Sequence, residues 1–479
     1  MKTPIFALLF ISLFAGQLWS QNTDDDNNPP FTMGLPAEED PYYDDMPVKA
    51  RLTNDNYRAV GSKASVKKYA PTPKSQGNYG TCAAWATAYA ARTILESQRY
   101  GWTDKDKIGE NVFAYGFVYR VTSSSSNCWG AYTSECIKNM RDIGVPKLSD
   151  YSVHCPDGDP PQYAYQKAGK HKIKGYATLW NSYSNYSRKQ KVDAAKKSLS
   201  EGNPIAISMI CPNSFYSPKG VWIPEYNDNP NNNPNHAHGR HAMCAVGYDD
   251  DKYGGAFEIQ NSWGSGWGNG GYIWIKYSDF ADFVYQAFEL FKFETLNENK
   301  EVELAGKVRF QLDTGNDMNA ELKRDKSYKM DRAYRSGTRF RLYISNNEPA
   351  YVYAFGSDLS NKTYQVFPHE KGISPALTYK ANDVAIPSED KHVRMDGTVG
   401  TDFLCVLYSK EPLNLEDIQR KVKQQSSRYT FKEKVQKALG DKLMKDSEVS
   451  YSSGSMNFKG KSKDGRSVVA LVVATEHID

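Results

Sequence analysis

The sequence predicts an α+β protein with more than one domain, and three observations support that class. The chain has 479 residues, more than a single domain usually contains. Helical periodicity dominates up to residue 200, and short β-prone segments bounded by turn residues follow it between 204 and 277. A second β-rich region starts near Glu301. We therefore expect a helical lobe, an antiparallel β lobe, and then a separate β-rich α+β domain over 300–479.

Three helices are expected in the first half of the chain. Cys82–Arg99 is rich in alanine and aromatic residues and is apolar on most sides, which is typical of a buried central helix. Glu135–Ile143 gathers its apolar residues on one face, and Gln190–Ser200 repeats apolar residues at helical spacing. In the C-terminal region the charged stretches Asn414–Lys423 and Thr430–Lys442 are also predicted to be helical.

The expected strands are short segments rich in β-branched and aromatic residues, bounded by glycine, proline and asparagine. In the β lobe they are PIAISMI (204–210), HAMCAVGYD (241–249), AFEIQNSW (256–263) and GYIWIKY (271–277). In the C-terminal region they are 308–313, 338–345, 350–357, 363–368, 403–409 and 467–475.

The N-terminus has the layout of a secretory signal peptide over residues 1–20. One lysine precedes an apolar stretch, Ile5–Ala15, which is shorter than the ~20 residues of a membrane-spanning helix. We expect an exported protein, secreted or periplasmic, with no transmembrane anchor after signal removal. Residues 21–61 are acidic with few apolar anchors, which predicts a disordered linker or a short pro-segment.

Charge and cysteine content narrow the partners and the compartment. A net charge of +4 without a long basic run gives no reason to expect nucleic acid or an anionic membrane as a partner. Seven cysteines in an exported chain permit disulfides and leave one thiol over. We expect one bridge from Cys155 to Cys128 or Cys136. Cys211 and Cys244 are expected to be apolar strand residues or a bridge.

Cys82 stands where a helix is predicted to begin, a position that favours a reactive thiolate because of the helix dipole. Its own backbone N–H and the Gln76 side chain could donate to an oxyanion. A buried cysteine is more often inert packing, so partners are needed. His241 begins one expected strand and Asn261 ends the next, where its carbonyl could orient the imidazole under the cover of Trp263.

Three strings, QGNYGTC, HAMCAVGYD and QNSWGSGWGNGGYIWI, together resemble the papain-like cysteine peptidases. The resemblance implies a two-lobed papain-like domain over 62–296 and a peptidase that cleaves peptide or protein substrates without a cofactor. It makes Cys82 the nucleophile, His241 the acid and base, Asn261 the orienting residue and Gln76 an oxyanion donor. The family's cysteine three residues before the nucleophile is Tyr79 here.

The same resemblance places substrate-binding residues in the β lobe. Ser208, Met209 and Ala242 fall near positions that line the family's main side-chain pocket, and Trp263 stands beside the catalytic pair. A pocket of this composition would suit an apolar or aromatic side chain. The long inhibitory pro-segment of many members does not fit into 21–61.

Other readings remain beside this one. His236, His238 and His241 form an H-x-H-x-x-H cluster, but no carboxylate or cysteine pattern completes a metal site, so we expect none. A catalytically inactive papain-like scaffold or an acyl transferase of the transglutaminase type could use the same fold or the same groups. The C-terminal region resembles an uncharacterised bacterial module, and as a surface binding domain it would take a cell-envelope or protein ligand.

Overall fold

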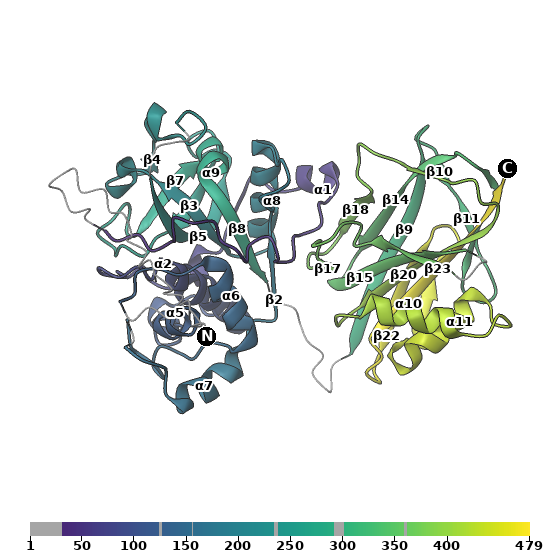
Figure 1. Ribbon diagram of the computed structural model, residues 1–479, viewed down its shortest axis with the longest axis horizontal. Coiled ribbons are helices and arrows are strands. Elements are labelled where there is room, and N and C mark those ends of the chain that lie inside the picture. The colour runs from purple at the N-terminus through teal and green to yellow at the C-terminus, as the bar shows by residue number, and fades with distance from the viewer. Residues whose placement is uncertain (1–30, 124–126, 156, 234–237, 292–300, 359–361) are drawn as a thin grey trace, which may run out of the picture.

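Two domains lie side by side in the computed structural model (Figure 1). The structure describes residues 31–123, 127–155, 157–233, 238–291, 301–358 and 362–479. The predicted signal peptide at 1–20 lies outside these residues. Within them, no helix has the length and apolar character needed to cross a membrane.

The first domain begins with a helical lobe built around the predicted central helix. That helix runs without interruption through α2 (Cys82–Ala84), a π-helical stretch (Trp85–Arg92) and α3 (Thr93–Tyr100), and its residues as far as Ser97 are buried. The surrounding helices are α4 (Lys105–Gly109), α5 (Tyr115–Thr122), α6 (Thr133–Asp142) and α7 (Gln162–Ala168). Small alanine side chains let the central helix lie close to the β lobe, so its first residue reaches the boundary between the lobes.

The second lobe is an eight-stranded sheet in the order β2-β8-β3-β5-β6-β7-β4, with β1 paired to β5. The strands are β1 (Lys63–Ser65), β2 (Gly175–Thr178), β3 (Ile205–Cys211), β4 (Val221–Trp222), β5 (Gly239–Asp249), β6 (Ala256–Gln260), β7 (Tyr272–Lys276) and β8 (Val284–Phe291). Helices α8 (Arg188–Ser200) and α9 (Tyr277–Phe283) accompany the sheet. The predicted antiparallel β lobe is confirmed, and β8, which the sequence reading missed, is a central strand.

Strand β5 shows why the site falls between the lobes. Ala242 and Cys244 belong to the core shared with the central helix, whereas Met243 and Ala245 belong to the core on the other face of the sheet. This alternation follows from the two-residue period of a strand. It brings the start of β5 against the start of the central helix.

The C-terminal domain contains two β-sheets and two helices. The first sheet has the order β18-β14-β9-β22-β21, and the second has the order β11-β12-β23-β20-β15-β16. Their main strands are β9 (Val302–Leu312), β14 (Arg339–Asn346), β15 (Ala350–Ser357), β16 (Thr363–Phe367), β18 (Asn382–Ile386), β20 (Gly400–Ser409), β22 (Asn457–Ser462) and β23 (Val468–Ile478). Shorter strands are β10 (Asp317–Met318), β11 (Ala320–Leu322), β12 (Tyr328–Met330), β13 (Tyr334–Arg335), β17 (Ala376–Leu377), β19 (Val393–Arg394) and β21 (Val449–Tyr451).

Alternation along β20 divides the core of this domain. Val406 and Tyr408 pack between the two sheets, and Cys405 and Leu407 pack toward the helices α10 (Leu415–Gln424) and α11 (Phe431–Leu439). In both helices the side chain of the N-cap residue accepts a backbone N–H of the first turn, and in α10 that residue is Asn414. The expected separate β-rich α+β domain is therefore present.

The expectation of a disordered linker over 21–61 is wrong for its described part, residues 31–61. Side chains along it, among them Leu35, Tyr43, Met46 and Val48, are less than a tenth exposed. The Tyr43 hydroxyl donates to the Trp180 carbonyl oxygen at 2.7 Å. The acidic composition suggested disorder, but widely spaced apolar residues find tertiary partners that no local pattern shows.

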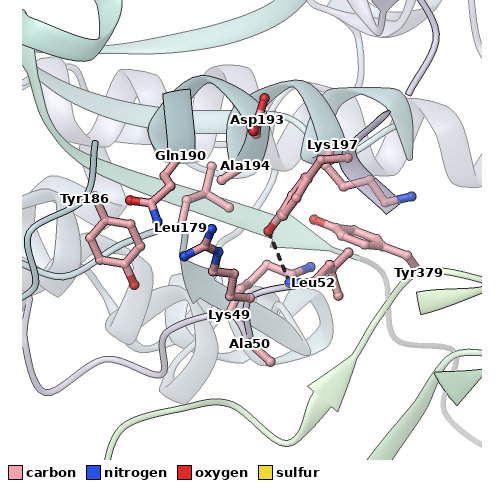
Figure 2. A pocket seen from close by; sticks show the side chains of 12 residues that line it. Lys49, Ala50, Leu52, Leu179, Tyr186, Gln190, Asp193, Ala194, Lys197 and Tyr379 are labelled. Carbon is pink, nitrogen blue, oxygen red and sulfur yellow. Dashed lines mark hydrogen bonds between the residues drawn. The ribbon is translucent and has the colours of Figure 1, made fainter. Parts of the chain in front are cut away.

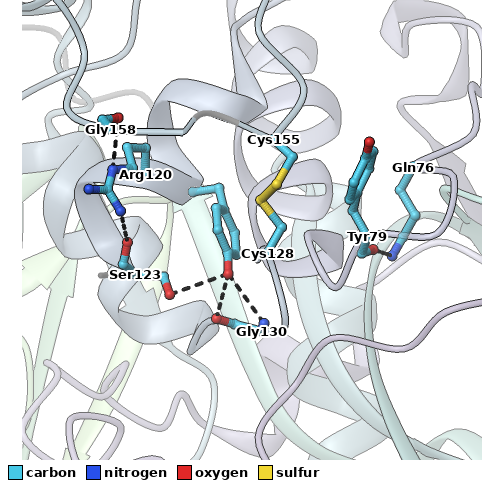
Figure 3. Close-up of a disulfide and its surroundings, with 9 residues drawn as sticks. Gln76, Tyr79, Arg120, Ser123, Cys128, Gly130, Cys155 and Gly158 are labelled. Atoms are coloured by element: carbon cyan, nitrogen blue, oxygen red, sulfur yellow. Dashed lines mark hydrogen bonds between the residues drawn. A yellow bond between two sulfur atoms is a disulfide. The ribbon is translucent and has the colours of Figure 1, made fainter. Parts of the chain in front are cut away.

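A disulfide joins Cys128 to Cys155, one of the two pairings expected for Cys155 (Figure 3). It closes the loop whose Cys128 carbonyl oxygen accepts a hydrogen bond from the Gly80 N–H at 2.6 Å. A side chain on Gly80 would collide with the carbonyl of Trp129, so glycine is required at this approach. Cys211 and Cys244 are buried and unbridged.

Candidate active site

Cys82 is the first residue of the central helix and is completely buried. The backbone N–H of Ala242 donates to its sulfur at 3.4 Å, and the backbone N–H of Gly34 also donates to it. The sulfur therefore lies directly beside the start of β5, next in sequence to His241. The fold therefore brings the Cys82 thiol beside the strand that carries the His241 imidazole, as the sequence predicts.

His241 and Asn261 are joined by a hydrogen bond of 2.7 Å between His241 Nε2 and Asn261 Oδ1. The same Asn261 oxygen accepts the backbone N–H of Ser262 at 2.7 Å, which fixes the direction of the amide. An acceptor at Nε2 favours the tautomer with the proton on that nitrogen. His241 Nδ1 is then the free basic atom, and it is buried with no hydrogen-bond partner among the described residues.

Trp263 covers this pair from the side. Its ring stacks on the His241 imidazole with centroids 4.6 Å apart and an interplanar angle of 28°. Phe215 and Trp267 pack around the same indole, and all three aromatic side chains are almost wholly buried. The cluster excludes water from the histidine–asparagine hydrogen bond, which strengthens it in a low-dielectric environment.

Gln76 lies in the loop that precedes the central helix. Its carbonyl oxygen accepts the Ser262 hydroxyl at 2.6 Å, and its amide donates to the carbonyl oxygen of Tyr79 at 2.7 Å (Figure 3). The amide makes a second hydrogen bond of 3.1 Å to the carbonyl oxygen of Thr32. The donor that an oxyanion would need is therefore present and engaged by the chain's own N-terminal segment.

Residues 31–46, hereafter the cover segment, fill the space over Cys82. Phe31 stacks on the outer face of Trp263 with centroids 4.8 Å apart and the rings nearly parallel. The Gly34 carbonyl oxygen accepts the Ala131 N–H at 3.1 Å. A side chain on Gly34 would overlap the carbonyl group of Gly80, so only glycine permits this close approach.

The cover segment is also held on both sides of the boundary between the lobes. The Leu35 N–H donates to the Arg240 carbonyl oxygen at 3.3 Å, and Ser134 Oγ donates to the Asp40 carboxylate at 2.7 Å. Leu35 belongs to the same buried apolar cluster as Ala242. The cover segment thus bridges the two lobes next to Cys82.

Burial controls the electrostatics of the covered site. Desolvation raises the pKa of the Cys82 thiol to about 11, against the backbone N–H groups that favour the thiolate. Desolvation also lowers the pKa of His241 to about 4, although its hydrogen bond to Asn261 opposes this. Both shifts favour neutral groups, so the covered pair is a thiol and an imidazole rather than an ion pair.

The three residues predicted to line a pocket lie on neighbouring strands. Ser208 pairs with Ala242 and Met209 pairs with His241 across the β3–β5 ladder, and all four are buried. The Ser208 hydroxyl is 3.1 Å from the hydroxyl of Thr133 on α6. The Ser208 hydroxyl therefore already has a hydrogen-bond partner inside the protein. The surroundings of Ala242 are mainly apolar.

The alternative histidine cluster does not assemble in the described residues. His236 lies outside them, and His241 directs one nitrogen to Asn261. The sequence reading missed the contacts of Thr32 and Gly34 with the site. No local signal marks these two residues, because their role depends on where the segment lies in space.

Comparison with known families agrees with this geometry. The two-lobed α+β fold, with a cysteine on the central helix and a histidine–asparagine pair on the sheet, defines the class of papain-like domains. Residues 62–284 match the papain family of cysteine proteases, and residues 333–412 match a domain family of unknown function, DUF4384. The first domain is therefore similar to the papain family of cysteine proteases, and it is followed by a domain whose family has no established role.

Two individual relatives match less than half of this chain. An uncharacterised peptidase C1-like protein of Acanthamoeba polyphaga mimivirus is 28% identical over 216 residues, which are 43% of this chain and 65% of that protein. Cathepsin K of Mus musculus is 29% identical over 212 residues, 43% of this chain and 56% of that protein. The chain spans less than two thirds of the length of these relatives. Among solved structures, xylellain, a cysteine protease from Xylella fastidiosa, is similar with a TM-score of 0.42 and 20% identity over 56% of this chain and 96% of that one.

Proposed function

We propose that this protein is an exported cysteine peptidase that hydrolyses peptide bonds through Cys82, His241 and Asn261. The observation that carries the proposal is the 2.7 Å hydrogen bond from His241 Nε2 to Asn261 Oδ1, which leaves Nδ1 without a hydrogen-bond partner among the described residues and available to take a proton. A thiol at a helix start, an oriented imidazole and an amide donor are the groups that acyl transfer to sulfur requires.

In the proposed reaction, His241 Nδ1 takes the thiol proton and the Cys82 thiolate attacks the carbonyl carbon of the substrate. The Cys82 backbone N–H and the Gln76 amide stabilise the oxyanion of the tetrahedral intermediate. The imidazolium then donates its proton to the leaving amine as the C–N bond breaks. Water, deprotonated by His241, attacks the thioester and releases the acid product and the free thiol.

The described protein is the latent form of this enzyme, and the cover segment is its pro-segment. Thr32 accepts from the oxyanion donor, Gly34 donates to the sulfur, and Phe31 covers the indole of Trp263. A substrate must displace all three contacts. Removal of the segment would also rehydrate Cys82 and His241, which favours the thiolate–imidazolium pair.

The resemblance to the papain-like peptidases places a substrate pocket near Ser208, Met209 and Ala242, and the apolar surroundings of Ala242 suit an apolar side chain of a peptide or protein substrate. Leu35 of the cover segment already shares the apolar cluster of Ala242. The Ser208 hydroxyl already forms a hydrogen bond with the Thr133 hydroxyl, so it offers no free polar group for substrate recognition. We expect substrates with an apolar residue near the cleaved bond.

Export, and an origin in a bacterium, belong to the same proposal. The composition of residues 1–20 is that of a signal peptide, and the disulfide between Cys128 and Cys155 suits an oxidising compartment. The mature protein would then act in the periplasm or outside the cell.

One experiment tests the proposal directly. The chain is prepared with a specific cleavage site placed after the cover segment, and the segment is released before the assay. Hydrolysis of a fluorogenic peptide and labelling of Cys82 by an epoxide inhibitor of thiol peptidases should appear only after release. Unchanged hydrolysis in Cys82→Ala, or labelling at another cysteine, would refute the assignment.

A further inference from the structure

The cover segment continues directly into residues that bind the C-terminal domain. Val48 makes parallel backbone bridges with Thr178 at the end of β2 and with Ile373 of the C-terminal domain. Its N–H donates to the Gly372 carbonyl oxygen at 2.8 Å, and its carbonyl oxygen accepts the Ser374 N–H at 2.7 Å. Residues 48–56, hereafter the anchor segment, are therefore held between the two domains, and Figure 1 shows this part of the chain passing from one to the other.

A buried charged cluster holds the first part of the anchor segment, and Figure 2 shows two of its members, Lys49 and Tyr379. Lys49 Nζ is 2.7 Å from the carboxylate of Glu289 on β8 and 2.6 Å from the Thr378 hydroxyl. The Tyr379 hydroxyl donates to the other oxygen of Glu289, and the Lys49 ammonium lies 3.4 Å from the centre of the Tyr379 ring. Glu289 is completely buried, so withdrawal of Lys49 would leave a carboxylate in the interior with fewer partners.

The rest of the anchor segment forms further hydrogen bonds with the C-terminal domain. The Thr53 N–H donates to the Asp383 carbonyl oxygen at 2.8 Å, and the Asn54 N–H donates to the Glu389 carboxylate at 2.8 Å. Asn56 accepts the Asp383 N–H at 2.7 Å and donates to the Ala381 carbonyl oxygen at 2.9 Å.

Apolar contacts add to these hydrogen bonds. Ala50 and Leu52 are buried in the main core cluster of the C-terminal domain. The occupant of this surface is thus a segment of the same chain, and it uses backbone, polar and apolar contacts together.

From these contacts we propose that the C-terminal domain is an intramolecular latch: it binds the anchor segment and thereby keeps the cover segment over Cys82. The anchor segment follows the cover segment closely in the chain. While the anchor segment stays bound, the cover segment is held near its site, so each dissociation of residues 31–46 is followed by rebinding at high effective concentration. This gives the accessory domain a partner, residues 48–56, and a role in keeping the peptidase latent. The role in latency rests on the proposed peptidase function, whereas the binding does not.

The test compares hydrogen exchange in full-length variants that all carry Cys82→Ala, so that no self-cleavage can occur. The latch variant is Asn56→Ala with Glu389→Ala, which removes three of the hydrogen bonds above and touches no group of the peptidase site. The matched control is Lys380→Ala, which removes an exposed ion pair with Glu348 on the same side of the C-terminal domain. We expect exchange of amides in 31–46 to rise by about tenfold or more in the latch variant and to stay unchanged in the control.

Unchanged exchange in 31–46, or a rise confined to 48–56, would overturn the latch. If exchange rises throughout both domains, the double variant has lost its fold, and Tyr379→Phe, which removes only the hydroxyl that contacts Glu289, decides by the same criterion. In proteins that keep Cys82, epoxide labelling should be faster in the latch variant. Faster exchange with no labelling even after release of residues 31–46 would refute the peptidase and leave the latch standing. Labelling after release with unchanged exchange would do the opposite.

Discussion

Each of the two domains contains a chain of three polar side chains with an imidazole in the middle. In the first domain it is Cys82, His241 and Asn261. In the C-terminal domain Ser336 Oγ lies 3.0 Å from His477 Nε2, and His477 Nδ1 lies 3.3 Å from the carboxylate of Asp402. By side-chain distances alone, the second set resembles the catalytic arrangement of serine hydrolases.

The two sets differ in the donors around the nucleophile. The N–H of Ser336 donates to the Ile478 carbonyl oxygen at 2.8 Å, and the N–H of Gly337 donates to the Met395 carbonyl oxygen at 3.1 Å. Both are permanent parts of the fold, so neither can stabilise an oxyanion. Gln76, in contrast, gives one of its hydrogen bonds to Thr32 of the cover segment, which can be removed. A triad is therefore catalytic only where its donors can be released to a substrate, and the C-terminal set is a structural contact that ties the end of β23 to the loop after β13.

The largest expected effect separates the thiol of Cys82 from the hydroxyl of Ser336. In protein freed of the cover segment, Cys82→Ala should reduce peptide hydrolysis by about 10⁴-fold or more, because the acyl acceptor is lost. Ser336→Ala should leave hydrolysis unchanged. Turnover of a fluorogenic peptide measures both, and loss of activity in Ser336→Ala alone would reverse the comparison.

The next effect concerns pH and the cover. Because the pKa of Cys82 in the covered protein is raised to about 11, its thiol stays protonated at neutral pH. The labelling rate by iodoacetamide should rise about tenfold per pH unit, hence about 10³-fold between pH 7 and pH 10. After release of residues 31–46 the rate at pH 7 should already be high and should vary little over this range. Mass spectrometry of the labelled peptide gives the rates, and a flat profile in the covered protein would contradict the buried thiol.

How much of the fold and of the candidate site the sequence predicts depends on how far apart the contacting residues lie along the chain. The residues expected to be catalytic stand in compact strings such as QGNYGTC, where neighbouring residues constrain one another. The fold joins His241 to Asn261 and brings Cys82 beside the strand of His241. The composition of residues 21–61 predicts a disordered linker or a short pro-segment, because the partners that order this region, Trp180 for Tyr43 and Thr178 for Val48, are far away in sequence. Ser336, Asp402 and His477 lie on three separate segments, so no local pattern announces their contact.

The next prediction concerns the expected oxyanion donor, the side-chain amide of Gln76. Gln76→Ala in the freed enzyme should reduce kcat by about 10²–10³-fold, as removal of one oxyanion donor does in other peptidases. KM should change little, because the donor acts mainly on the transition state. Steady-state kinetics separates the two quantities. A variant with raised KM and unchanged kcat would show that Gln76 only positions the substrate.

A smaller effect is expected when the cover segment packs less closely against Gly80. Gly34→Ala introduces a methyl group that would overlap the Gly80 carbonyl, and crowding of this kind costs about 1–3 kcal/mol. The covered state should weaken accordingly, and epoxide labelling of Cys82 in the uncut protein should accelerate about tenfold or more. Gly61→Ala is the control in the same N-terminal region and should label at the original rate, because an added Cβ there would meet the Lys63 carbonyl oxygen only at an ordinary contact distance of 3.9 Å. Equal rates in both variants would show that Gly34 does not set the fit.

The smallest effect returns to the C-terminal set. Ser336→Ala removes the hydroxyl beside His477 Nε2, and His477 is only 2% exposed, so water cannot easily replace the lost partner. We expect the free energy of unfolding to fall by about 1–2 kcal/mol in urea, against little change in Thr314→Ala, an exposed hydroxyl in a turn of the same domain. A Ser336→Ala protein as stable as the parent would mean that the hydroxyl is not a structural contact. Because the donors around it are permanently occupied, such a result would still give it no catalytic role.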